Sequence, residues 1–130
     1  MAECGCGKKV KEKNILIYAC SGSANVAEIS DRVARELMHS GKGKMFCLAG
    51  LGADIQGMVQ TARDADLNLV IDGCPMHCAQ KVFDRHGISN YKCVTVTELG
   101  IEKAKTRCTD EQVKMILEQV DKFLSQQICG

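Results

Sequence analysis

The sequence predicts an α/β domain of three layers, in which an open, mostly parallel sheet of four strands carries helices on both faces. Short apolar runs of strand length alternate along the chain with longer segments whose apolar residues recur at helical spacing. That alternation is typical of a parallel sheet with crossover helices. At 130 residues, the chain has room for one domain of ordinary size and not for two.

The first segments predict a strand, a helix and a second strand. Residues 14–19 form a continuous apolar run between a charged stretch and a Ser/Gly cluster, which is typical of a buried parallel strand. A tight turn at 20–25 follows, and apolar residues at helical spacing then predict a helix over 26–40. A second short strand is expected at 44–48, closed by the glycine-containing segment 49–52.

The middle of the chain repeats the pattern. Spaced apolar residues predict a helix over 55–66, and residues 67–71 form a third apolar strand. The segment 72–78 follows this strand. Because Pro75 lacks the N–H that the first turn of a helix leaves unpaired, it suits the start of a third helix, which would run to about His86.

The last third predicts one more strand and a long helix. Residues 91–97 are rich in β-branched side chains and are expected to form the fourth strand, followed by an irregular stretch at 98–108. Residues 109–112 match a capping box that opens a helix with a buried apolar stripe from Val113 to Leu124. Right-handed crossovers between four strands most simply give the flavodoxin-like strand order 2-1-3-4.

Composition narrows the classes of function. Hydrophobic residues make up 45% and charged residues 25% of the chain, with a net charge of +1 and only 4% aromatic residues. This balance is typical of a soluble globular protein and gives little support for nucleic acid as a partner. No apolar run approaches the roughly 20 residues of a membrane helix, so we expect no membrane partner. Residues 1–13 are rich in lysine and contain no long apolar run. We therefore expect a flexible tail at 1–13 and a single domain at 14–130.

The chain contains nine cysteines. An odd number rules out complete intramolecular pairing, and disulfide scaffolds are usually secreted chains too small for a core. With no export signal evident, we expect a cytoplasmic protein whose thiol clusters serve metal or redox chemistry. Some of the nine would simply be small buried hydrophobes, since a free cysteine often has that role.

Position along the chain selects four of them. Cys20, Cys47, Cys74 and Cys78 follow or end the first three predicted strands. The carboxyl ends of parallel strands share one edge of the sheet, where open α/β folds bind their ligands. Cys74 and Cys78 are four residues apart, which would place both on one face of a first helical turn. Four thiolates suit a tetrahedral Zn²⁺, so the sequence predicts one zinc ion per chain at this edge.

Two other kinds of chemistry fit the same thiols. In a redox or sulfur-transfer enzyme, Cys20 or Cys74 would be the nucleophile, because a helix N-terminus near either one stabilises a thiolate. Cys78, or the pair Cys4 and Cys6, would then act as the resolving thiol. A Cys₄ set also suits an iron–sulfur cluster. His77 is a further candidate ligand that would replace one cysteine. The sequence names no substrate and no protein partner.

The remaining cysteines are expected to matter less. Cys4 and Cys6 form a C-x-C pair in the tail, able to pass a metal or reductant to the main site or simply part of a disordered end. Cys93 lies within the fourth predicted strand and reads as core packing. Cys108 and Cys129 are expected to be bystanders.

The motifs resemble the DGC-domain family, which is described as chelating zinc through four cysteines. The most specific of them is the run Ile71-Asp-Gly-Cys-Pro-Met-His-Cys-Ala79. Shorter matches lie at residues 20–22, 46–50 and 97–103, and the resemblance extends in order over about 14–125. It implies a zinc protein with the same four cysteines as ligands and leaves the activity open.

Overall fold

Four parallel strands form one sheet in the order β2-β1-β3-β4 in the computed structural model, which describes residues 13–129. The predicted class and strand order are therefore confirmed. The prediction of a tail at 1–13 falls outside the described residues, apart from Lys13. The strands are β1 (Ile15–Ala19), β2 (Lys44–Met45), β3 (Leu67–Asp72) and β4 (Tyr91–Thr95).

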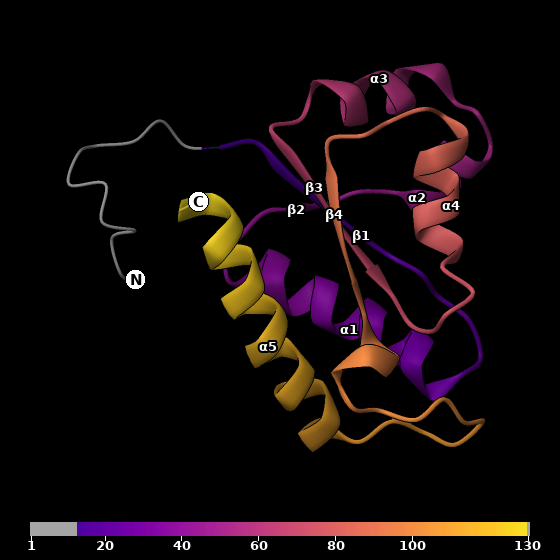
Figure 1. Ribbon diagram of the computed structural model, residues 1–130, viewed down its shortest axis with the longest axis vertical. Coiled ribbons are helices and arrows are strands. Elements are labelled where there is room, and N and C mark those ends of the chain that lie inside the picture. Colours follow the sequence, from indigo (N-terminus) through magenta and orange to yellow (C-terminus); the bar gives the residue numbers. More distant parts are fainter. Residues whose placement is uncertain (1–12, 130) are drawn as a thin grey trace.

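The helices divide between the two faces of the sheet (Figure 1). One face carries α1 (Asn25–His39) and α5 (Asp110–Cys129). The other face carries α2 (Leu48–Gly52), α3 (Gln56–Asp64) and α4 (Cys78–Arg85). A 3₁₀ turn, η1 (Val96–Leu99), follows β4.

Alternation along the strands builds a separate core on each face. In β1, Ile15 and Ile17 pack with α1 and α5, whereas Leu16 and Tyr18 pack with α2, α3 and α4. Because both faces are covered, the strand reads in sequence as one continuous apolar run. The helices contribute their predicted apolar stripes, and in α5 Val113, Ile116, Val120 and Leu124 are buried as expected.

The capping box at the start of α5 is formed as predicted. The backbone N–H of Gln112 donates to Oγ1 of Thr109 over 3.1 Å, and the Gln112 side chain accepts from the Thr109 N–H over 3.0 Å. These reciprocal bonds satisfy two donors at the helix start.

The prediction for the second strand was too long. Pairing with β1 ends after Met45, apart from one bond from the Phe46 N–H to the Ile17 carbonyl. Cys47 is extended and forms the N-cap of α2, so residues 49–52, predicted as a turn, belong to a short helix. Five residues are too few to show a helical period, and this segment therefore gave no signal of a helix.

The start of the third predicted helix and the end of the fourth strand also differ. α4 begins at Cys78 and not at Pro75, because the carboxylate of Asp72 accepts from the N–H groups of Ala79 and Gln80 over 2.9 and 3.1 Å. A helix starts where its free N–H groups find partners. Cys74 therefore precedes the helix and does not share a helical turn with Cys78. The strand predicted at 91–97 ends at Thr95, where η1 takes over.

Tyr18 is a fully buried aromatic residue at the end of β1. Its ring stacks edge-on against Phe83 with centroids 4.8 Å apart, and its hydroxyl has no hydrogen-bond partner among the described residues. Tyr18→Phe should therefore raise the free energy of unfolding by about 1 kcal/mol, since an unpaired buried hydroxyl is costly. Urea unfolding at neutral pH would measure this change, and a loss of stability would show that the hydroxyl has a partner.

The same substitution has a predicted pH dependence. Burial raises the pKa of Tyr18 above its usual range, so the unfolded chain releases the phenol proton at lower pH than the folded chain. The contribution of this group is complete below about pH 10 and is lost as the pH rises beyond it. Above about pH 10, the free energy of unfolding should therefore fall less in the Tyr18→Phe variant than in the wild type.

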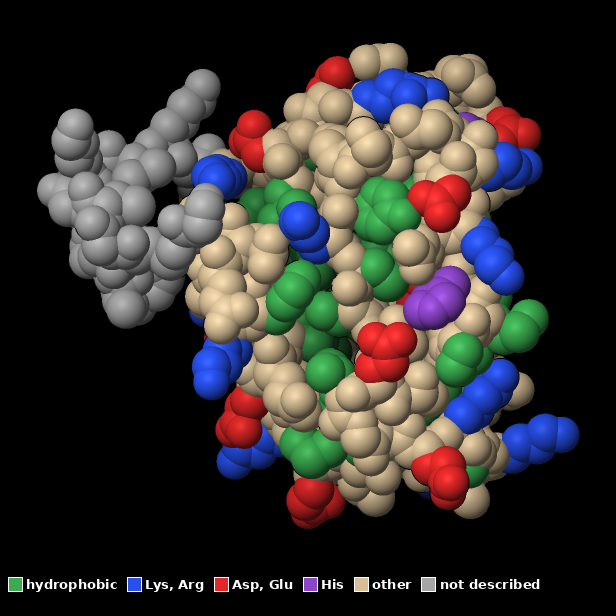
Figure 2. Space-filling view, in the orientation of Figure 1, with side chains coloured by type: hydrophobic (Ala, Val, Ile, Leu, Met, Phe, Trp, Pro, Cys, Tyr) green, Lys and Arg blue, Asp and Glu red, His purple; other side chains and the backbone are tan. Residues whose placement is uncertain are grey.

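The charged side chains on the surface are mixed in sign, as expected for a chain with a net charge of +1. On the face that Figure 2 shows, Lys and Arg side chains are interspersed with Asp and Glu. Of the helices within residues 13–129, none combines the length and the apolar character that crossing a bilayer requires.

Candidate metal centre

A pocket of about 530 Å³ lies at the carboxyl edge of the sheet and is lined by three of the predicted thiols, Cys20, Cys74 and Cys78. They come from the residue after β1, from the loop after β3 and from the first residue of α4. The loop from Ser21 to Ala24 and the segment from Lys103 to Lys105 also line the pocket. The carboxyl edge thus brings together three of the four cysteines, and we call this site the cysteine pocket.

The sulfur of Cys20 has one backbone and one side-chain hydrogen-bond partner. The N–H of Gly73 donates to its sulfur over 3.0 Å, and Oγ of Ser30 lies 3.5 Å from the same sulfur. Burial nevertheless raises the pKa of the Cys20 thiol, and the nearby Asp72 and Cys78 raise it further. Without a cation, Cys20 is therefore held as a neutral thiol.

Gly73 makes this arrangement possible. A Cβ at this position would lie 3.0 Å from the carbonyl carbon and oxygen of Val26 and 3.1 Å from the nitrogen of Ala27. The backbone after β3 therefore passes against the start of α1 with no space for a side chain. This close approach puts the Gly73 N–H next to the sulfur of Cys20.

Cys74 and Cys78 are the other two thiols of the cysteine pocket. Cys74 is half-buried and its sulfur receives a hydrogen bond from Nζ of Lys103 over 3.4 Å. Cys78 is exposed at the N-terminus of α4. Lys103 thus places a positive charge beside Cys74, and the N-terminus of α4 places a partial positive charge at Cys78.

Cys47 lies apart from the lining of the cysteine pocket. It is exposed at the N-cap of α2. Continuing the pairing of β2 with β1 beyond Met45 would bring Cys47 level with Ala19, one residue before Cys20. The four predicted sulfurs do not include three that all lie within 4.8 Å of one another.

A second set of potential ligands lies beside the pocket. Oδ2 of Asp72 is 3.6 Å from Sγ of Cys93 and 3.9 Å from Nδ1 of His77, and the three atoms all lie within 4.8 Å of one another. We call this set the Asp–His–Cys cluster. Burial, together with the charge of Asp72, raises the pKa of the Cys93 thiol to about 12. The cluster could hold a metal ion, and its ligand atoms are separate from the thiols of the cysteine pocket.

Only part of this cluster is predictable from the sequence. The sequence predicts His77 as a replacement ligand and Cys93 as core packing, and Cys93 does pack against the core on the α4 face. Asp72 pairs with Thr95, and residues two apart in a strand share a face, so Cys93 lies diagonally across from Asp72. This signal depends on the register of β4 against β3, which a sequence pattern does not supply.

The other cysteines contribute no ligand set among the described residues. Cys108 is half-buried, and Nη1 of Arg32 lies 3.6 Å from its sulfur. Cys4 and Cys6 lie outside the described residues, as does the side chain of Cys129. The predictions made for these three cysteines stay predictions.

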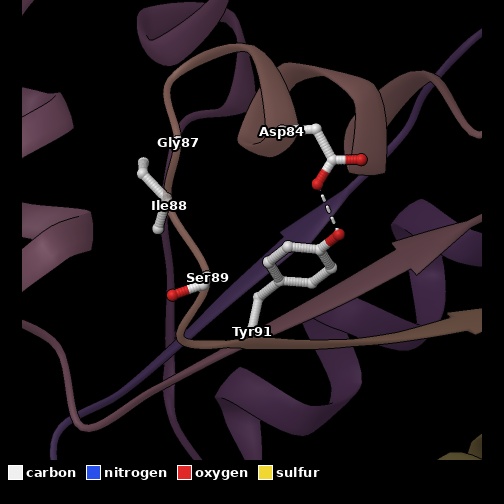
Figure 3. Close-up of a pocket in the computed structure, with 5 residues that line it drawn as sticks. All are labelled: Asp84, Gly87, Ile88, Ser89 and Tyr91. Atoms are coloured by element: carbon white, nitrogen blue, oxygen red, sulfur yellow. Dashed lines mark hydrogen bonds between the residues drawn. The ribbon is translucent and has the colours of Figure 1, made fainter.

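A different pocket opens where β4 begins (Figure 3). It has a volume of about 460 Å³, and Tyr91 donates a hydrogen bond to Asp84 across it over 2.7 Å. Its lining contains no cysteine or histidine. This pocket therefore has fewer potential metal ligands than the carboxyl edge of the sheet.

Comparison with known proteins agrees with the motifs. The model of the DGC domain matches residues 16–120. The anaerobic and virulence modulator AnvM of Pseudomonas aeruginosa is 32% identical to the chain over 111 residues, which cover 85% of each protein. No solved structure matches the chain. The resemblance carried by residues 71–79 is confirmed, and the chain belongs to the DGC-domain family.

Proposed function

We propose that this protein binds a zinc ion at the carboxyl edge of its sheet, with Cys20, Cys47, Cys74 and Cys78 as ligands. The observation that carries the proposal is the cysteine pocket, in which three of these thiols line one cavity. Hydrophobic packing alone does not require three thiols from separate segments to line the same cavity. Thiolates are ligands that zinc prefers.

The surroundings of the pocket suit the charge of such a site. Four thiolates and one Zn²⁺ carry a net charge of −2, which a partly buried site must offset. The ammonium of Lys103 lies against Cys74, and the Gly73 N–H points at Cys20. The N-terminus of α4 adds a partial positive charge at Cys78.

Cys47 is proposed as the ligand that closes the shell. Its segment is held to the sheet by a strand of only two residues, so few backbone bonds oppose a local shift toward the pocket. Cys47 is exposed, and moving its side chain breaks no described hydrogen bond. A complete Cys₄ shell leaves no position for a substrate, which indicates a structural or metal-handling role.

A thiol enzyme is the second candidate, and the contact between Lys103 and Cys74 favours it. The ammonium of Lys103, 3.4 Å from the sulfur, would stabilise the Cys74 thiolate as a nucleophile in redox or sulfur-transfer chemistry. Cys20 fits this role less well, because burial raises the pKa of its thiol. An iron–sulfur cluster on the four thiolates would need the same convergence as zinc.

Metal analysis of single cysteine variants tests the proposal. The chain would be purified without oxygen, and its zinc, iron and free thiols measured for the wild type and for Cys→Ser at each of the four positions. Each variant should lose one zinc equivalent, and the matched control Cys108→Ser should lose none. Protein free of zinc, with Cys74 reacting much faster than the other thiols, would contradict the proposal and favour the enzyme. Iron with visible absorbance would indicate the cluster.

A further inference from the structure

We propose that Asp72, His77 and Cys93 form a second metal site, which binds zinc through one carboxylate, one imidazole and one thiolate and keeps a coordination position open. It goes beyond the four-cysteine site, with which it shares no ligand. The proposal rests on the distances among the three ligand atoms, on the burial of the Asp72 side chain and on the conformation and surroundings of His77.

The spacing of the three ligand atoms is close to that of a zinc shell. Ligands at zinc distances of 2.0–2.3 Å in a tetrahedron are about 3.3–3.8 Å from one another. Oδ2 of Asp72 lies 3.6 Å from the sulfur of Cys93 and 3.9 Å from Nδ1 of His77. The set therefore needs only small side-chain movements to surround one ion.

Asp72 is a buried carboxylate, and His77 is its one basic neighbour among the described residues. It is 1% exposed, and among residues 13–129 no lysine or arginine nitrogen lies within 4.0 Å of it. A buried charge normally requires a paired cation or a metal. The N–H groups of Ala79 and Gln80 satisfy part of its bonding capacity and hold the carboxylate in place, as partners outside the shell do in metal sites.

His77 shows two unusual features at the same residue. Its Nδ1 is buried and has no hydrogen-bond partner within the part of the chain that the structure describes, although Asp72 lies close by. Its backbone is left-handed, with a φ of 53°, a conformation that residues other than glycine rarely adopt. Strain of this kind persists where the surroundings impose it, and here it places an unused nitrogen beside a carboxylate and a thiol.

The donor set selects the kind of metal. One sulfur, one nitrogen and one oxygen ligand suit zinc, whereas magnesium and calcium prefer oxygen alone. A thiolate and a carboxylate balance the two charges of Zn²⁺, so the ligated site is neutral and suits its buried position. Three protein ligands leave a fourth position for water or a small ligand, which the proposed Cys₄ shell does not.

Zinc loading of variants tests this second site. A parent chain would carry Cys4→Ser, Cys6→Ser and Cys129→Ser, so that cysteines near the two ends bind no metal. The parent is expected to bind one zinc more than its His77→Ala and Cys93→Ser variants when each is loaded and dialysed. His39→Ala and Cys108→Ser are the matched controls and should bind as much zinc as the parent. Circular dichroism would confirm that each variant is folded.

Cobalt gives a second measurement that does not depend on counting zinc. In a parent that also carries Cys20→Ser, Cys74→Ser and Cys78→Ser, one bound Co²⁺ should show the sulfur-to-metal absorption of a single thiolate. Cys93→Ser should abolish that absorption, and His77→Ala should weaken the binding at least tenfold.

The outcomes separate this inference from the proposed function. Unchanged zinc content in folded His77→Ala and Cys93→Ser chains would overturn the second site and leave the cysteine site standing. Zinc that is lost in these two variants and kept in the Cys20, Cys74 and Cys78 variants would support the second site and overturn the proposed function.

Discussion

Zinc at about a thousand times its Kd should raise the free energy of unfolding of the metal-free chain by about 4 kcal/mol. The reason is that the ligands converge only in the folded state, so the free energy of binding adds to that of folding. Urea unfolding with and without zinc would measure the increase. A background of Cys4→Ser, Cys6→Ser, Cys129→Ser and His77→Ala limits the measurement to the cysteine pocket.

Two substitutions serve as controls for this expectation. Cys20→Ser in the same background should lose most of the zinc-dependent increase, whereas Cys108→Ser should keep it, because Cys108 contacts Arg32 and lies outside the pocket lining. An equal increase in both variants would show that zinc acts elsewhere on the chain.

Gly73→Ala should lower the free energy of unfolding by about 2–3 kcal/mol, because overpacking against main-chain atoms has few ways to relax. The added Cβ would lie 3.0 Å from the carbonyl carbon and oxygen of Val26, which are backbone atoms of α1 and cannot rotate away. The shift that relieves this contact should also move the Gly73 N–H away from Cys20. Zinc affinity should therefore fall together with stability, as thermal unfolding and zinc titration would measure.

Gly52→Ala is the matched control for Gly73→Ala. A Cβ on Gly52, the last residue of α2, would have no neighbour within 4 Å. Its stability should change by less than about 1 kcal/mol, since alanine is the better helix former. Equal losses in the two variants would mean that the contact with α1 does not explain the effect of Gly73→Ala.

Much of the fold could be predicted because its signals are local. The apolar run of β1 and the Thr109 capping box each depend on a few consecutive residues, and the structure confirms both. α2 escaped prediction because its five residues show no period. The start of α4 depends on the carboxylate of Asp72, six residues before the helix, and the sequence pattern offered Pro75 as the nearer signal.

The part of the candidate site that follows from the order of the strands could be predicted from the sequence. Knowing that parallel strands end at one edge was enough to bring Cys20, Cys74 and Cys78 to the same pocket. The place of Cys47 depended on the length of β2, which a short apolar segment leaves undefined. The closeness of Cys93 to Asp72 depends on the register of β4 against β3. The position of the His77 ring depends on a left-handed backbone, which no residue pattern predicts.

X-ray absorption at the zinc edge tests the central claim most directly. The sample would be the chain with Cys4→Ser, Cys6→Ser and His77→Ala, loaded with one zinc equivalent. Four sulfur neighbours at about 2.3 Å are predicted for the shell of Cys20, Cys47, Cys74 and Cys78. A shell made mainly of nitrogen and oxygen, or a chain that retains no zinc, would contradict it.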